Sequence, residues 1–164
     1  MSMDTNTSLN ALLPELVACV EDDLAAQKRI LTLVEEQLEN LRSERGRGLE
    51  ELAEGMVDEL RGAPERTSRR DAVLARFAAA WGLEPKGVTL SMVTQNLGER
   101  AEGLGALRAE LRSTTAEVVR SLRKFSALVS TRRRLVGDVL RSLLESEEPG
   151  RSEDQRGVLL DAEV

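Results

Sequence analysis

Residues 97–144 carry apolar side chains at alternating intervals of four and three residues, and this spacing constrains the fold more than any other feature of the sequence. The series consists of Leu97, Ala101, Leu104, Arg108, Leu111, Thr115, Val118, Leu122, Phe125, Val129, Arg132, Val136, Val139 and Leu143. Eleven of these fourteen positions are apolar. A heptad pattern of this length predicts one long amphipathic helix whose seam packs against other helices.

Composition favours the same fold class. The chain has 164 residues, of which 41% are apolar, 32% charged and only 2% aromatic. Leu, Ala, Glu and Arg dominate, as they do in helical bundles and coiled coils. We therefore predict an all-α protein, an elongated helical bundle with a coiled-coil-like seam and a core of mainly Leu, Val and Ala.

A second long helix is expected over residues 12–61, where apolar residues recur at helical spacing. Proline lacks the amide hydrogen that a helix interior needs, so Pro14 is expected in the first turn of this helix, which then starts near Leu12. Gly46 and Gly48 each weaken the helix by about 1 kcal/mol relative to Ala, so a bend is expected near them.

Two short helices are expected between the long ones. Ser68 and Asp71 predict the N-cap of the first, and Gly82 suits a left-handed residue just past its end. Thr89 or Ser91 caps the second, and Gly98 marks its end or a kink. One face of the first short helix carries Val73, Leu74, Phe77, Ala78 and Trp81.

These elements predict a simple topology and one boundary. The long helices, 12–61 and 98–145, are expected to pack antiparallel, joined by the two short ones. Residues 1–148 are then a single helical domain. Residues 149–164, which begin with Pro149-Gly150, are expected to form a flexible acidic tail.

The sequence lacks the residues that most catalytic and metal sites need. It contains no His, and Cys19 is its single Cys, which excludes His-dependent triads and zinc clusters. Gly103 and Gly105 lie within a helical pattern and follow no strand, so they do not form a phosphate-binding loop. We predict no enzymatic activity, no cofactor and no metal. The paired carboxylates are expected on solvated faces or in the tail: Glu35-Glu36, Glu50-Glu51 and Glu147-Glu148.

A cytoplasmic location is expected. A lone Cys19 cannot form a disulfide within the chain, and reduced cysteines are typical of the cytoplasm. No apolar run approaches the roughly 20 residues of a membrane span. The first residues, MSMDTNTS, lack the basic and apolar regions of a secretory signal.

Charge is unevenly distributed along a chain whose net charge is −6. Residues 120–134 include six basic side chains and no acidic one, whereas residues 145–164 include seven acidic and two basic ones. Arg132–Arg134 are most simply a solvated face, and alternatively steer an acidic partner. Nucleic-acid binding would need more positive charge and stacking aromatics, so we expect none. The apolar triplet Val158–Leu160 lies within the acidic tail.

From Arg69 onward the sequence resembles the FlgN family of flagellar type III secretion chaperones. The resemblance is carried by a helix ending in Gly82-Leu83, a short Thr-Leu helix starting at Thr89-Leu90, and the cadence LRAEL at residues 107–111. The family commonly has two Asn three residues apart further along the long helix. The matching positions here are Arg123 and Ser126, so the sequence departs from the family pattern there.

The resemblance implies a cytoplasmic chaperone that binds terminal helical segments of hook-associated proteins before export, with the export apparatus as a further candidate partner. Family members engage clients through their C-terminal part. Apolar groups here occupy more than one face of the long helix, which is wider than a two-helix seam needs. The predicted partner-binding residues are Arg132, Leu135, Val136, Val139, Leu140, Leu143 and Leu144.

Two other classes of function remain open. The first is a structural coiled-coil or scaffold protein that homo-oligomerises. A homodimer is compatible with the chaperone as well as with the scaffold. The second is a helical nucleic-acid adaptor that uses residues 120–134. A scaffold would bury its seam in a long symmetric dimer, whereas a chaperone would leave part of the seam open. Nucleic-acid binding would weaken steeply with salt.

Overall fold

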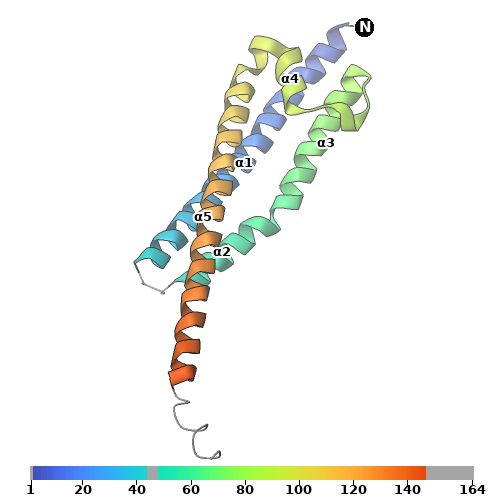
Figure 1. The fold of residues 1–164 in the computed structure, drawn as a ribbon. Coiled ribbons are helices and arrows are strands. Elements are labelled where there is room, and N and C mark those ends of the chain that lie inside the picture. The colour runs from blue at the N-terminus through green and yellow to red at the C-terminus, as the bar shows by residue number, and fades with distance from the viewer. Residues whose placement is uncertain (1, 44–47, 147–164) are drawn as a thin grey trace, which may run out of the picture. The chain divides into compact units, whose positions relative to one another are not determined.

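The computed structural model describes residues 2–43 and 48–146, with side chains described for 9–43 and 48–144. The described residues contain no strand, and the all-α prediction is confirmed. The elements are α1 (Ser2–Arg42), α2 (Leu49–Arg61), α3 (Ala63–Trp81), η1 (Pro85–Gly87), α4 (Leu90–Leu97), η2 (Gly98–Ala101) and α5 (Glu102–Ser146) (Figure 1).

The chain divides into two compact units, and the division falls inside α5. The first unit runs from Met1 to Phe125 and the second from Ser126 to Val164. Within the second unit, the described structure is a single stretch of helix, residues 126–146. The predicted boundary between residues 148 and 149, and the tail beyond it, lie outside the described residues and stay predictions.

Within the first unit, α1 and α3 run antiparallel, whereas α1 and α5 run in the same direction. Ion pairs joining α1 to α2 and α3 have falling partner numbers as α1 proceeds: Glu15–Arg76, Asp22–Arg69 and Arg29–Glu59. The partners of α1 on α5 instead have rising residue numbers as α1 proceeds. Leu16 shares a core cluster with Leu104, and Lys28 Nζ lies 2.6 Å from Glu110 Oε1.

The expected antiparallel pairing of the two long helices is therefore wrong. The physical reason is that residues 63–81 form a third long helix instead of a short one. Three passes of the chain return the last helix to the direction of the first. Arg69 and Arg70 of α3 pair with Asp22 and Asp23 of α1, so charges anchor a stretch of α3 that carries few apolar residues.

Glycine and proline positions explain where the helices end. Gly48 adopts the left-handed conformation, φ 81°, directly before α2, so the expected single helix over 12–61 is interrupted there. Gly46 lies outside the described residues. Gly62 alone separates α2 from α3, and Pro64 fits the first turn of α3. The helix therefore begins at Ala63, and the predicted cap at Ser68 is wrong.

Pro14 does not start a helix. Helix α1 begins at Ser2 and contains Pro14 in its interior, which removes one backbone hydrogen bond. Leu12 and Leu16, on either side of the proline, are 2% and 0% exposed. We infer that burial of these side chains offsets the lost hydrogen bond and keeps the turn helical.

The caps around the α3–α4 connection follow the sequence prediction. Gly82, φ 66°, is the left-handed residue that ends α3, and Leu83 N donates to Ala78 O at 2.9 Å, as in a Schellman motif. Thr89 is the N-cap of α4, because its Oγ1 accepts from Met92 N at 3.3 Å. Gly98, φ 54°, ends α4 as expected.

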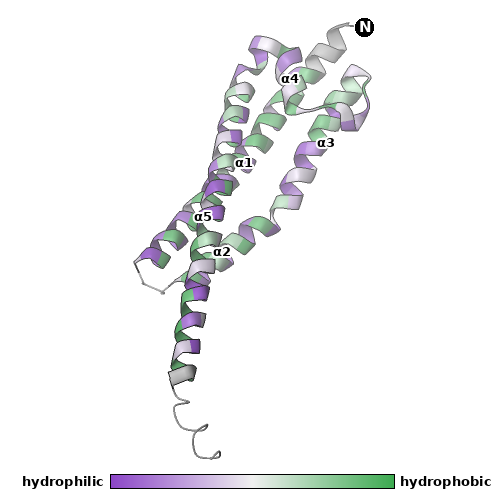
Figure 2. Cartoon of the chain, in the orientation of Figure 1, coloured by the Kyte–Doolittle hydropathy of each residue, from purple (hydrophilic) through white to green (hydrophobic). Residues whose placement is uncertain are grey.

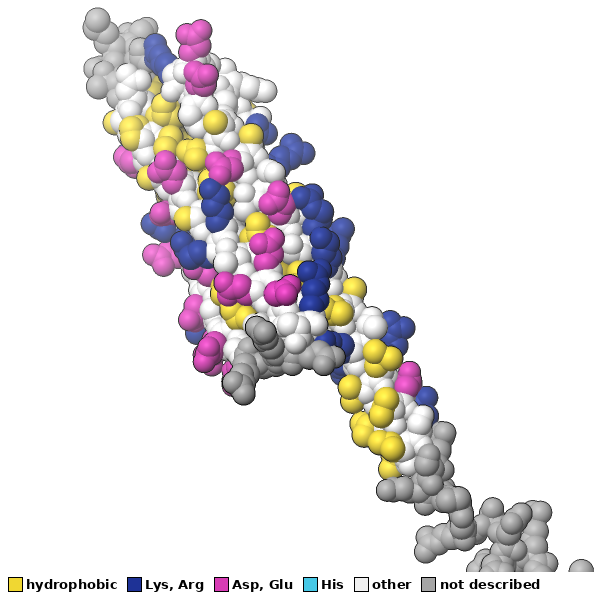
Figure 3. Space-filling view, turned by 90° about the vertical axis from the view of Figure 1, so that its left-hand side faces the viewer, with side chains coloured by type: hydrophobic (Ala, Val, Ile, Leu, Met, Phe, Trp, Pro, Cys, Tyr) yellow, Lys and Arg dark blue, Asp and Glu magenta, His cyan; other side chains and the backbone are white. Residues whose placement is uncertain are grey.

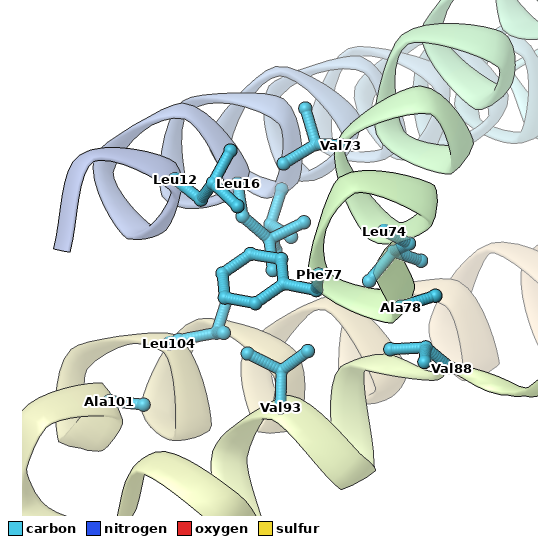
Figure 4. Close-up of a cluster of buried hydrophobic side chains, with 11 residues drawn as sticks. Leu12, Leu16, Val73, Leu74, Phe77, Ala78, Val88, Val93, Ala101 and Leu104 are labelled. Atoms are coloured by element: carbon cyan, nitrogen blue, oxygen red, sulfur yellow. The ribbon is translucent and has the colours of Figure 1, made fainter. Parts of the chain in front are cut away.

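One cluster of apolar side chains forms the core at the end of the first unit where α4 lies (Figure 4). Phe77 is fully buried at its centre, with side chains of α1, α4 and α5 around it. The Phe77 and Trp81 rings lie 5.5 Å apart at a tilt of 48°. The cluster comprises Leu12, Leu16, Val20, Val73, Leu74, Phe77, Ala78, Val88, Val93, Ala101 and Leu104.

The remaining length of the first unit is held by a thinner apolar seam. Helix α2 packs beside the second half of α1, where the buried residues are Ala26, Ile30, Val34, Gln37, Leu38 and Leu41. On α5, Val118 is buried, while Leu111 and Leu122, also predicted as seam residues, are half-buried. Coloured by hydropathy, α5 alternates apolar and polar residues along its length (Figure 2).

Candidate protein-binding surface

A hollow between α1, α3 and α5 is lined by three charged side chains, Asp23, Arg66 and Arg70. Its volume is about 190 Å³. Arg66 Nε lies 3.9 Å from Asp23 Oδ1, and Arg66 Nη2 donates to the backbone carbonyl of Glu59 at 2.8 Å. Arg70 also pairs with Asp23. The residues that line the hollow are Asp23, Ala26, Gln27, Ala63, Arg66, Thr67, Arg70, Leu111 and Thr115.

This network is best explained as structural. Arg66 and Asp23 side chains are only 14% and 13% exposed, and Arg66 pairs with both Asp23 and Glu59. Arg66 ties the end of α2 to α3 through the Glu59 carbonyl and simultaneously reaches α1. A charge in a partly buried position is costly unless an opposite charge pairs with it, and these pairs meet that need within the chain.

The Arg29–Glu59 pair joins α1 to α2 and makes stability depend on pH. Hydrogen bonding from Arg29, whose Nη2 donates to Glu59 Oε2 at 3.1 Å, lowers the pKa of Glu59 below its ordinary 4.5. A carboxyl whose pKa is lower in the folded state stabilises that state above the unfolded pKa, and this contribution is lost as pH falls through the folded pKa.

We therefore expect Glu59→Gln to lower the free energy of unfolding at pH 7 but to have little effect well below pH 4.5. Urea unfolding curves of the parent and the variant at several pH values measure the difference. Glu54→Gln, a change at an exposed acid on the same helix, is the control. A Glu59→Gln deficit that persists undiminished at the lowest pH would contradict the assigned pair.

The surroundings of Cys19 disfavour its reactive thiolate form. Cys19 is half-buried and packs against the core cluster. Burial raises the pKa of the Cys19 thiol above 9.0, which keeps the nucleophilic thiolate scarce near neutral pH.

Among the described residues, no group of three or more His, Cys, Asp or Glu side chains is arranged to hold a metal ion. None of the described helices has the length and apolar character needed to cross a membrane.

The second unit carries a continuous row of exposed large apolar side chains, which we call the apolar stripe. Its members are between 55% and 66% exposed, and among the side chains that the structure describes only Leu60, of the other large apolar residues, is exposed to a similar extent. Figure 3 shows yellow side chains gathered over the last described turns of α5. The stripe consists of Leu135, Val136, Val139, Leu140, Leu143 and Leu144.

The stripe is exposed because the described part of the second unit is one helix. Within residues 126–146, the described part of that unit, no second element packs on it. Residues at four-residue intervals advance by about 40° around a helix, so the three adjacent pairs together cover about half of its circumference. A face of that width, left open on a stable helix, is typical of a surface that binds another protein.

Arginines border the stripe on its N-terminal side. Arg132 is half-buried, and Arg133 and Arg134 are exposed. All seven residues predicted to bind a partner thus lie on one helical segment, and six of them are strongly exposed. Dark blue basic side chains also follow α5 in the first unit (Figure 3).

Sequence reasoning missed a second, smaller exposed patch. Val57 and Leu60 of α2 are 45% and 56% exposed, although Leu60 continues the apolar period that predicts burial. Helix α2 has no buried residue, so its apolar face is only partly covered by α1. No signal in the sequence distinguishes this face from a core face.

In comparisons with protein-family models, curated proteins and solved structures, no match to this chain was found.

Proposed function

We propose that the protein is a cytoplasmic export chaperone of the FlgN type, which binds a terminal helical segment of a hook-associated flagellar protein before type III secretion. The observation that carries the proposal is the apolar stripe, whose members are at least 55% exposed. The sequence resemblance over residues 69–144 supports the client class. No chemistry is needed for this role.

The stripe has the properties that an amphipathic client helix requires. Anchors at spacings of one and four residues present a broad apolar face into which a second helix can lay its own apolar side chains. Arg133 and Arg134, both exposed beside the stripe, attract an acidic client and raise its association rate. Ordering of a flexible client on binding costs several kcal/mol, which keeps the complex reversible.

The alternative of a long scaffold coiled coil is disfavoured because seam residues of α5 in the first unit are already buried within one chain. Leu104 and Val118 are 1% and 6% exposed within a single chain. A symmetric dimer along all of α5 would need those side chains for its own interface. The chain already covers the seam in the first unit, and the part available to a partner is the stripe.

The proposal is tested by calorimetry with the full chain and terminal segments of hook-associated proteins. We expect Val139→Asp with Leu143→Asp to weaken binding at least about 100-fold, because two charges enter an apolar interface. Far-UV helicity should stay near that of the parent. The matched control is Val57→Asp with Leu60→Asp, which changes exposed apolar residues on α2 and should leave affinity unchanged.

Equal loss of affinity in both double variants would show that the stripe has no special role. Absence of binding by the parent to every such segment would contradict the client class. Binding that persists in the stripe variant would place the client elsewhere on the molecule.

A further inference from the structure

Three arginines of the second unit lie on one flank of the apolar stripe. Each residue advances a helix by about 100°, so Arg133 falls within about 20° of Leu144 around the circumference, and Arg134 and Arg141 follow within about the next 80°. Arg141 Nη1 lies 3.9 Å from Asp138 Oδ1, on the polar side away from the stripe. Figure 3 shows dark blue side chains beside the yellow ones over the last described turns of α5. One edge of the stripe is therefore basic.

This segment of α5 is positively charged, although the whole chain is acidic. Residues 126–144 contain four arginines and one aspartate, a formal charge of four minus one, or +3, whereas the whole chain carries −6. The widest exposed apolar face and a local excess of positive charge thus coincide on one helical segment. A helix with aliphatic side chains on one face and arginines beside them is typical of helices that lie in the surface of an anionic bilayer.

The width of the stripe favours a bilayer over a single partner helix. An apolar arc of about 100° is enough for a helix that packs on a protein core. The six side chains of the stripe cover about half of the circumference, so one partner helix would leave part of the stripe in water. A bilayer surface is flat and fluid, so a helix that lies in its plane immerses an apolar face of this width and keeps its polar face in water.

We propose that the apolar stripe is a peripheral membrane-binding surface whose partner is an anionic phospholipid bilayer. The helix lies parallel to the bilayer surface, with the stripe at the boundary between headgroups and acyl chains. Arg133 and Arg134 lie at the level of the phosphates, which their charge attracts. The stripe occupies residues 135–144, about 15 Å of helix, so it anchors the chain weakly and reversibly.

The inference does not rest on the proposed function, because lipid binding is measured with the protein and vesicles alone. If that function holds as well, a client helix and the bilayer compete for the same side chains. Failure of client binding would leave lipid binding unaffected, and failure of lipid binding would leave client binding unaffected. The two proposals can therefore be tested separately.

Co-sedimentation of the full chain with large unilamellar vesicles tests the inference. Vesicles of phosphatidylcholine and phosphatidylglycerol in equal parts are compared with vesicles of phosphatidylcholine alone, over a range of lipid concentrations. We expect the chain to bind the anionic vesicles at least about 10-fold more strongly than the neutral ones, because the arginines beside the stripe attract anionic headgroups. Added salt should reduce the difference, because it screens that attraction.

The requirement for the stripe is tested with two variants that change the net charge equally. Val139→Asp with Leu143→Asp should weaken binding to anionic vesicles at least about 10-fold, because two charges replace apolar groups within the immersed face. Val57→Asp with Leu60→Asp, which changes exposed apolar residues of α2, is the matched control and should bind like the parent. Far-UV circular dichroism of each variant checks that its helicity is that of the parent.

The requirement for positive charge is tested at the edge of the stripe. Arg133→Glu with Arg134→Glu should weaken binding to anionic vesicles about 10-fold. Arg133→Lys with Arg134→Lys keeps the charge and should retain most of the binding.

Absence of binding by the parent to anionic vesicles would overturn the inference. In that event, binding of a client segment through the stripe would assign the stripe to a protein partner, and dimerisation through it would assign the stripe to a second copy. Equal losses in the two aspartate variants would show that net charge governs binding and would remove the stripe as its cause. Equal binding to neutral and anionic vesicles would contradict the choice of an anionic bilayer.

Discussion

Phe77→Ala should lower the free energy of unfolding by about 3–5 kcal/mol, the range for truncation of a buried aromatic side chain. Phe77 is fully buried and lies at the centre of the core cluster, where α1, α3, α4 and α5 meet (Figure 4). Its removal deletes the ring contact with Trp81 and leaves a cavity that four helices would have to move together to fill. Urea or thermal unfolding followed by circular dichroism measures the loss.

Phe77→Leu is the matched control, because it keeps an apolar side chain of similar reach at the same site. It should cost less than half as much as Phe77→Ala. Equal losses for the two variants would indicate that the site is not close-packed. An unchanged midpoint for Phe77→Ala would contradict the core described above.

The second prediction compares two leucines of the same helix. Leu104→Ala should cost about 2–5 kcal/mol, whereas Leu143→Ala should stay within about 0.5 kcal/mol of the parent. Leu104 is 1% exposed in the core cluster, and Leu143 is 58% exposed in the apolar stripe. Helix propensity changes by the same amount in both variants, so the difference between them reports tertiary packing alone.

Unfolding is measured at low protein concentration, so that contacts between separate chains do not contribute. A similar loss for both variants would show that the C-terminal part of α5 is covered by the chain itself. That result would also remove the basis for the proposed binding surface.

The apolar periodicity predicted most of the elements, because burial along one helix face leaves a direct trace in the sequence. The α5 helix, the caps at Gly82 and Thr89, and the burial of Phe77 follow from that trace and from local backbone preferences. Local preferences determine a cap within a few residues, independently of the rest of the fold.

The topology could not be predicted in the same way. Residues 63–72 contain only two apolar side chains other than proline, Ala63 and Ala72, so the periodicity gives no helix there. What holds this stretch is a set of ion pairs from Arg66, Arg69 and Arg70 to acids of α1, which are distant in sequence. Pro14 failed as a boundary signal for a related reason, because tertiary burial of its neighbours outweighed a local preference.

The residues of the candidate site could be named from the sequence, but the reason why they stay exposed could not. The width of the apolar face at residues 135–144 indicated that partner helices were needed, and the exposure of all six side chains agrees with that. Periodicity alone does not say which part of a seam is satisfied within the chain. The same pattern at Leu60 also ends on an exposed side chain.

The composition of the core cluster has a consequence for how the protein is made. The cluster unites Leu12 and Leu16 with Ala101 and Leu104, so its first and last members are separated by most of the first unit. A ribosome must therefore synthesise about 90 residues between the first apolar side chain of the core and the last. During that interval the apolar face of α1 is without its final partners, and contacts of long sequence separation form slowly. A nascent chain arrested before Ala101 is expected to need protection from aggregation.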